Sequence, residues 1–188
     1  MPSDDEKELL IRIRKDPQLF SVLYDRYYTP IFAYVFRRLG NYESARDLTA
    51  ESFLKAFQKI NSFQWRAISV SSWLYRIATN EINNYFRKSK YKPSRLEDIQ
   101  LHQHLQYEEG LETEKASLEK AFRENREFTT VQQQLLLLDI SYQEIIALRF
   151  FEGKSIKEIA EIVGRKEGTV KSLLSRGMEK LRIAVEKS

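Results

Sequence analysis

The sequence predicts an all-α protein made of two small helical domains joined by a linker. Two observations favour this fold class. Apolar residues recur every three or four positions along most of the chain, the spacing at which one face of an α-helix turns toward a core. The 188 residues include only 6 glycines and 4 prolines, which is little punctuation for the many short strands of a β-sheet protein.

The first domain is expected to span residues 1–90 and to begin with two helical segments. The first covers residues 6–15 and ends near an Asp-Pro pair. The second covers residues 20–39, as one long helix or as a pair of helices. Because proline lacks the backbone N–H that a helix interior uses, Pro30 is expected near a turn or in a first helical turn.

A stop signal separates this segment from the third helix. Gly40 readily takes the left-handed conformation that ends helices, and Asn41 can cap the next helix, predicted over residues 42–59, through its side-chain oxygen. Residues 61–72 then lose the helical period and concentrate aromatic, basic and hydroxyl side chains. We therefore predict an exposed loop there.

A fourth helix follows this loop, with Ser71 or Ser72 as its cap and Lys88 at its end. One of its faces is apolar, and another carries polar side chains at successive spacings of three or four residues. Asparagine is unfavourable inside helices because its side chain competes for backbone hydrogen bonds, so three asparagines within five positions indicate a polar role. The residues of this polar face are Arg76, Asn80, Asn83, Asn84 and Arg87.

Residues 91–130 change in character and are expected to form an acidic linker. His102 and His104 are two positions apart, which on a helix directs them to different faces, so they predict no metal site. No glycine-rich phosphate-binding loop or nucleophile motif occurs in the sequence, and the acidic residues lack apolar surroundings that would shift their pKa values. The sequence thus predicts no catalytic residues, cofactor or metal, and no enzyme.

The second domain is expected to span residues 131–188, with two helices followed by a helix-turn-helix from Ser155 to Arg182. Ser155 and Glu158 have the spacing of a capping box, and Gly164 can take the left-handed turn between the two helices. The outer face of the second helix carries groups suited to base edges and phosphates in a DNA major groove: Lys166, Lys171, Ser172, Ser175, Arg176 and Glu179. The alternative is an ordinary helical hairpin with a solvated basic face.

The composition of the chain indicates where the protein is located and what kind of molecule it binds. The chain has no cysteine, so disulfides and thiolate metal sites are excluded and the cytoplasm is the expected location. Neither a signal peptide nor a membrane span is expected, because no apolar stretch is long enough. The net charge is +4, with basic segments on both sides of the acidic one, a distribution that fits nucleic-acid binding.

Three motifs, in this order, resemble bacterial RNA polymerase sigma factors of the sigma-70 family, specifically the extracytoplasmic-function group. DLTAESFLKAF (residues 47–57) resembles the segment that grips the polymerase clamp. SSWLYRIATNEINNYFRK (71–88) and IIALRFFEGKSIKEIAEIVGRKEGTVKSLLSRGMEKLR (145–182) resemble the two conserved DNA-binding regions. Residues 1–90 then correspond to sigma region 2 and residues 131–188 to sigma region 4.

The resemblance implies an alternative sigma factor that binds core RNA polymerase at its clamp and flap and directs promoter recognition and melting. It also implies control by an anti-sigma partner. The implied core-polymerase contacts are Asp47, Leu48, Glu51 and Phe53. The implied contacts to the melted −10 element are Phe63, Trp65, Arg66, Arg76, Asn80, Asn83, Asn84 and Arg87. The implied contacts to the duplex −35 element are Arg149, Lys166, Thr169, Lys171, Ser172, Ser175, Arg176 and Lys180.

Some positions depart from the family pattern. Ala50 stands where many relatives carry glutamine, and Leu173, Gly177 and Met178 lie where arginines are frequent. Fewer phosphate contacts predict weak, salt-sensitive binding to DNA without polymerase. Trp73 fits a core position somewhat better than a base-stacking one. Two other functions stay open: a helix-turn-helix regulator that acts without core polymerase, and a sigma-like adaptor that binds only proteins.

Overall fold

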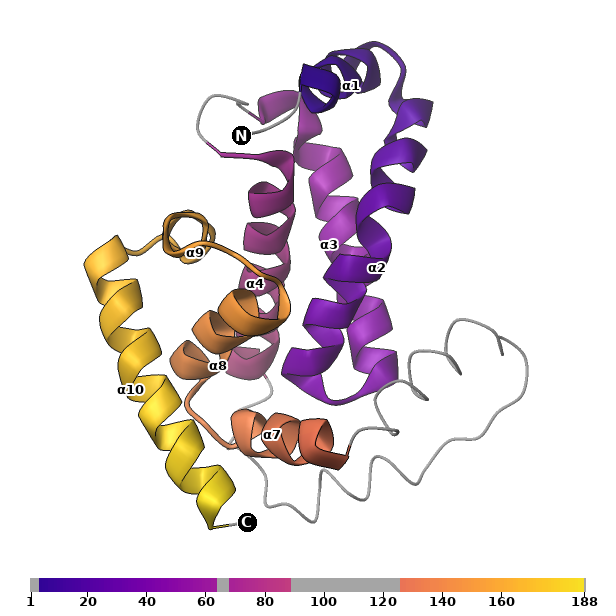
Figure 1. Cartoon of the computed structure of the whole chain (residues 1–188). Coiled ribbons are helices and arrows are strands. Elements are labelled where there is room, and N and C mark those ends of the chain that lie inside the picture. Colours follow the sequence, from indigo (N-terminus) through magenta and orange to yellow (C-terminus); the bar gives the residue numbers. More distant parts are fainter. Residues whose placement is uncertain (1–3, 64–67, 89–125, 188) are drawn as a thin grey trace.

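The computed structural model describes residues 4–63, 68–88 and 126–187, and all regular structure in these ranges is helical (Figure 1), which confirms the all-α prediction. The N-terminal half contains α1 (Asp4–Lys15), η1 (Pro17–Leu19), α2 (Phe20–Leu39), α3 (Tyr42–Lys59), η2 (Ile60–Ser62) and α4 (Val70–Lys88). The C-terminal half contains α7 (Arg126–Leu136), α8 (Ile140–Ile146), the π-helical turn η3 (Ala147–Phe151), α9 (Ile156–Val163) and α10 (Glu167–Glu186).

Two of the predicted features lie partly or wholly outside these ranges. Most of the expected linker, residues 91–130, is not described, and α7 begins inside it at Arg126. The expected −10 contacts Trp65 and Arg66 are also outside the described residues.

Helices α2, α3 and α4 pack on one another and enclose the core of the N-terminal half. A buried polar group spans two of them: the Tyr34 hydroxyl lies 2.9 Å from the Thr79 hydroxyl and accepts a hydrogen bond from Nη1 of Arg38 at 3.2 Å. Arg38 is fully buried, and its guanidinium lies 6.0 Å from the ring centroids of Tyr34 and Phe86. Aromatic faces thus surround a buried cation here, a favourable arrangement for a charge away from water.

The helix ends in this half are largely as predicted, with one exception. Gly40 ends α2 in the left-handed region at φ 69°, and Oδ1 of Asn41 accepts a hydrogen bond from the Ser44 backbone at 2.8 Å. The expectation that Pro30 lies near a turn is wrong, because α2 is continuous and contains it. Residues 31–35 are all buried, and their packing offsets the backbone hydrogen bond that a proline removes from a helix.

The predicted loop of residues 61–72 is also shorter than expected. Phe63 is buried, with its ring centroid 4.5 Å from that of Trp73, and α4 already begins at Val70. Ser69, rather than Ser71 or Ser72, caps the helix by accepting a hydrogen bond from the Ser72 N–H at 3.0 Å. The apolar side chain of Val70 is buried, which explains the earlier start. Trp73 is a core residue, as favoured from the sequence.

In the C-terminal half, the helix-turn-helix forms as predicted. Ser155 and Glu158 make both hydrogen bonds of the capping box, and Gly164 ends α9 at φ 66°. Helix α10 packs on α7, α8 and α9. Its closest approach to α8 is at Gly177, where a Cβ atom would lie 3.1 Å from side-chain atoms of Ile146 and Tyr142. The absent side chain therefore sets the distance between these two helices.

The two halves are packed against each other. Helix α9 lies on α4 and η3 lies on α2, and Figure 1 shows α8 and α9 beside α4, with α10 on the outside. One cluster of buried side chains runs through both halves, from Phe86 on α4 to Ile145 on α8 and Ile162 on α9. A further contact joins the Gly40 turn to Leu136 of α7. The described part of the chain thus has a core that crosses the boundary between the halves, and a second, smaller buried cluster joins α7, α8 and α10.

Replacing Gly177 with valine is expected to destabilise the protein by about 1–3 kcal/mol, because the added side chain overlaps Ile146 and Tyr142. Urea unfolding of the full chain measures this. Gly168→Val is the control on the same helix, because nothing lies within 4 Å of a Cβ there, and we expect a change within about 0.5 kcal/mol. Equal unfolding free energies for the two variants would contradict the described contact between α8 and α10.

Phe63→Ala is expected to lower the free energy of unfolding by roughly 3–5 kcal/mol, because it leaves a cavity against Trp73. Phe63→Leu keeps most of the volume and is expected to lose less. Phe150 has 57% of its surface exposed, so Phe150→Ala serves as a matched control with little effect. A Phe63→Ala protein as stable as the control would show that the ring is not in the core.

Candidate nucleic-acid interface

The outer face of α10 is largely polar, although Met178 and Ile183 are also exposed on this helix. Its apolar and small residues Val170, Leu173, Gly177 and Leu181 are buried, so the helix turns one side inward. Within this polar strip, Nη2 of Arg176 donates to the Ser172 hydroxyl at 3.1 Å. All of the residues predicted here as −35 contacts are exposed, and these are Lys166, Thr169, Lys171, Ser172, Ser175, Arg176 and Lys180.

Arg149, the remaining predicted −35 contact, lies on the π-helical turn before the helix-turn-helix. Its side chain is exposed, and Nη1 donates to the backbone oxygen of Lys154 at 3.0 Å. This bond holds the guanidinium beside the start of α9. The capping box lies immediately after Lys154, and the pKa of Glu158 is lowered because hydrogen bonds from Ser155 outweigh partial desolvation of the carboxylate.

The polar face of α4 is divided between solvent and the C-terminal half. Asn80 is exposed, and Nη2 of Arg87 donates to Oδ1 of Asn84 at 3.0 Å near the helix end. In contrast, Nε of Arg76 donates to the backbone oxygen of Glu161 at 3.0 Å, and Nδ2 of Asn83 donates to a carboxylate oxygen of Glu144 at 3.2 Å. The structure therefore groups the predicted residues into an accessible set and an engaged set.

The segment predicted to bind core polymerase lies on α3, and its members differ in exposure. The side chains of Asp47 and Glu51 are 71% and 51% exposed, and Leu48 is half-buried. Phe53 is only 3% exposed, so its expected role as a surface contact is wrong in the packed chain. It lies on the inner face of the helix, with its ring centroid 4.8 Å from that of Tyr24.

Sequence reasoning missed two exposed apolar residues on the same helix. Leu54 and Phe57 are 56% and 40% exposed. Leu54 follows Asp47 by seven positions, which places it on the same helical face. That spacing is the signal in the sequence that could have predicted the exposure of Leu54.

A second group that the sequence did not indicate joins the two halves at Glu152. Arg37 donates to one carboxylate oxygen at 2.6 Å, and the Tyr75 hydroxyl donates to the other at 2.5 Å. Burial raises the pKa of Glu152 against the opposing effect of Tyr75 and Arg37, and burial likewise lowers the pKa of Lys154 nearby. No local pattern could reveal this group, because its members come from distant segments.

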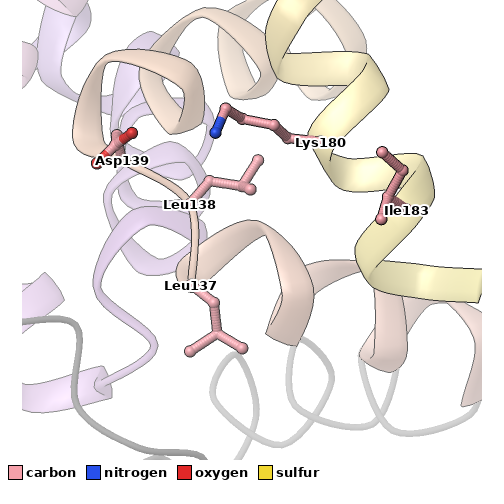
Figure 2. A pocket seen from close by; sticks show the side chains of 5 residues that line it. All are labelled: Leu137, Leu138, Asp139, Lys180 and Ile183. Atoms are coloured by element: carbon pink, nitrogen blue, oxygen red, sulfur yellow. The ribbon is translucent and has the colours of Figure 1, made fainter. Parts of the chain in front are cut away.

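The hollow found beside α10 offers little chemistry. It has a volume of about 270 Å³, and Figure 2 shows that α10 contributes Lys180 and Ile183 while the connection between α7 and α8 contributes Leu137, Leu138 and Asp139. Over the described ranges, no three acidic or histidine side chains gather in a way that could bind a metal ion. In the same ranges, none of the helices has the length and apolar character needed to cross a bilayer.

Sequence comparisons with known proteins identify a family for both halves of the chain. Residues 23–91 match the family model for sigma-70 region 2, and residues 129–181 match the model for sigma-70 region 4. The chain is 33% identical to the extracytoplasmic-function sigma factor SigW of Bacillus subtilis, over 94% of both proteins. It is 31% identical to the sigma factor BldN of Streptomyces coelicolor, over 86% of this chain and 58% of BldN.

Solved structures agree in fold. CnrH, in complex with the cytosolic domain of CnrY, superposes with a TM-score of 0.69 and 20% identity, over 98% of this chain and 99% of CnrH. The sigma factor RpoE of Bartonella quintana, in complex with the anti-sigma factor NepR, superposes with a TM-score of 0.64 and 21% identity, over 89% of this chain and 96% of RpoE. From the family models and SigW together, the chain belongs to the extracytoplasmic-function group of sigma-70 family RNA polymerase sigma factors.

Proposed function

We propose that this sigma factor reads the duplex −35 element of its promoters with the outer face of α10 and the melted −10 element with the polar face of α4. As a member of its family, it binds core RNA polymerase and directs promoter recognition. The observation that supports the division of roles is the exposure of every predicted −35 side chain on or beside α10, while Val170, Leu173 and Gly177 of the same helix are buried.

The α10 face fits a major groove in chemistry and in form. A helix of the helix-turn-helix enters that groove with its N-terminal residues toward the base edges. Lys171 and Arg176 can donate to guanine or phosphate oxygens, and the serine hydroxyls can donate or accept. The strip carries few cations, so its affinity for duplex DNA alone is expected to be low and to depend strongly on salt.

The −10 element needs a different surface, because single-stranded bases expose their hydrogen-bonding edges. Asn80, Asn84 and Arg87 supply amide and guanidinium groups for those edges and for the strand backbone. Phe63 does not take part, because its ring is in the core. Trp65 and Arg66 remain proposed contacts to the −10 strand because of the family resemblance.

For the polymerase clamp we propose a surface on α3 made of Asp47, Glu51, Leu54 and Phe57, with Leu48 at its edge. Exposed acids beside exposed apolar side chains are typical of a protein-binding surface. Leu54 and Phe57 take the place that the sequence assigned to Phe53. The flap of core polymerase is proposed to bind the C-terminal half.

We further propose that the chain has no catalytic step of its own, works in the cytoplasm with RNA polymerase and is held inactive by an anti-sigma factor. The last point draws on the named complexes of RpoE with NepR and of CnrH with CnrY. A binding assay with a co-purified partner tests it.

Changing both Lys171 and Arg176 to alanine is expected to weaken binding to a −35 duplex by about tenfold or more, because two cations leave the groove-facing strip. Fluorescence anisotropy at several salt concentrations measures this, and the salt dependence should become shallower. Lys157→Ala on α9 is an exposed-cation control. Equal losses in the control and the double variant would argue against α10 as the reading helix.

Asn80→Ala is expected to reduce open-complex formation severely while leaving binding to core polymerase unchanged, because Asn80 lies on α4 and the proposed clamp surface lies on α3. Permanganate reactivity of melted thymines reports opening, and co-purification reports core binding. Gln18→Ala, an exposed amide on η1, is the matched control for opening. Loss of core binding in Asn80→Ala would contradict the division between the two helices.

A further inference from the structure

The second helix of the helix-turn-helix begins with an exposed acid. Glu167 is the first residue of α10 and lies between Lys166 and Lys171, two of the proposed −35 contacts. Figure 1 shows this end of α10 at the outer edge of the molecule. Residues four apart share a helical face, so Glu167 lies on the same side as Lys171 and Ser175. This end of the helix is the one that reaches base edges when such a helix enters a major groove.

The carboxylate of Glu167 is not engaged by the chain itself. The other two acids of α10 both pair with Arg182, Glu179 at 3.1 Å and Glu186 at 3.5 Å. Lys171 stands at the spacing that favours an ion pair with Glu167. Over residues 4–63, 68–88 and 126–187, however, no ion pair or hydrogen bond of the Glu167 side chain is observed. The carboxylate is therefore available to a ligand.

The next residue, Gly168, indicates that this ligand comes close to the helix. Glycine lowers the stability of a helix, and its usual structural reasons do not apply here. The φ of Gly168 is not positive, and nothing in the described ranges lies within 4 Å of a Cβ placed there. A missing side chain in the first turn does allow an external surface to approach the helix backbone. The start of α10 thus combines an available acid with room for DNA.

A carboxylate is selective among the groups that DNA presents. It accepts hydrogen bonds but cannot donate them, and the N4 amino group of cytosine is the donor that Glu and Asp contact in the major groove. The phosphates, and the acceptor edges of guanine and thymine, repel it. Adenine has an amino donor as well, but its N7 acceptor lies beside that donor. An acid between two cations therefore penalises a wrong base instead of adding affinity for all DNA.

We propose that Glu167 specifies one base of the −35 element by accepting a hydrogen bond from the N4 amino group of a cytosine. Lys166 and Lys171 hold the start of α10 against the DNA, and the carboxylate then rejects a base that offers no donor there. This role rests on the proposed −35 function of α10 and adds a residue that is not among the predicted −35 contacts. Promoters of this factor are then expected to share a cytosine, on either strand, opposite the start of α10.

A purely structural role for Glu167 would have a different signature. An acid in the first turn of a helix interacts favourably with the helix dipole. Loss of that interaction would weaken binding to all DNA sequences by the same factor. A base contact instead changes which sequences are preferred, so base preference is the quantity to measure.

The first test maps base preference in the assembled holoenzyme. Core RNA polymerase with the full chain transcribes a library in which the −35 segment of a start site mapped by run-off transcription is randomised. At one position we expect cytosine to be favoured roughly 5–100-fold over other bases. Glu167→Gln is expected to move that preference to adenine, because a side-chain amide pairs with N6 and N7 of adenine. Glu186→Gln, an exposed acid at the far end of α10, is the matched control and should change no position.

Unchanged preference at every position in Glu167→Gln overturns the proposal, and so does a library result without any preferred cytosine. The double change of Lys171 and Arg176 to alanine distinguishes this failure from a failure of the proposed function. If that variant alters the −35 preferences while Glu167→Gln does not, only the role of Glu167 is wrong. If neither variant alters them, α10 is not the reading helix.

The second test uses the sign of the effect on two DNA duplexes. One carries the mapped −35 element, and the other has thymine in place of the preferred cytosine. By fluorescence anisotropy at low salt, Glu167→Ala is expected to bind the first duplex about 3–10-fold more weakly than the unchanged chain, because one hydrogen bond is lost. It should bind the second at least as tightly, because the repelled carboxylate is gone. Equal weakening on both duplexes, with helical content unchanged by circular dichroism, overturns the proposal in favour of the structural role.

Discussion

The packing of the C-terminal half on α4 is the constraint on which the rest of the structure depends. Glu152 is held by one donor on α2 and another on α4, and the buried cluster continues across the boundary. A buried ion pair is favourable only when its partners are well placed, because both charges lose water. Here the aromatic hydroxyl of Tyr75 and the guanidinium of Arg37 fulfil that requirement. The helices of the two halves therefore form one packed body.

This packing divides the polar residues by availability. The polar residues of α10 are accessible while the two halves are packed together. The α3 surface that we propose for the polymerase clamp is accessible as well. The α4 face is only partly accessible, because Arg76 and Asn83 contact the other half.

Much of the fold followed from local signals in the sequence. Gly40 and Asn41 marked a helix boundary, and the capping box with Gly164 marked the helix-turn-helix, because each of these devices acts within a few residues. The errors arose where packing overrides local preference. Pro30 lies inside α2 because the residues after it are buried. Phe63, which was predicted to lie in an exposed loop, is buried because its ring packs on that of Trp73.

The site was predictable to a similar extent and for the same reason. The exposure of the α10 residues followed from helical periodicity, which a sequence displays directly. The burial of Phe53 and the exposure of Leu54 depended on how α3 sits against α2, and the Glu152 group depended on segments far apart in the chain. Contacts of this kind leave no periodic trace. They depend on how the helices pack together in three dimensions.

Run-off transcription on fragmented genomic DNA, with core RNA polymerase in the presence and absence of this protein, tests the account most directly. The account predicts discrete new start sites, each preceded by shared −35 and −10 sequences. Binding to core without any new start would contradict it in favour of a protein-binding adaptor. Binding to duplex DNA with indifference to core would contradict it in favour of a conventional regulator.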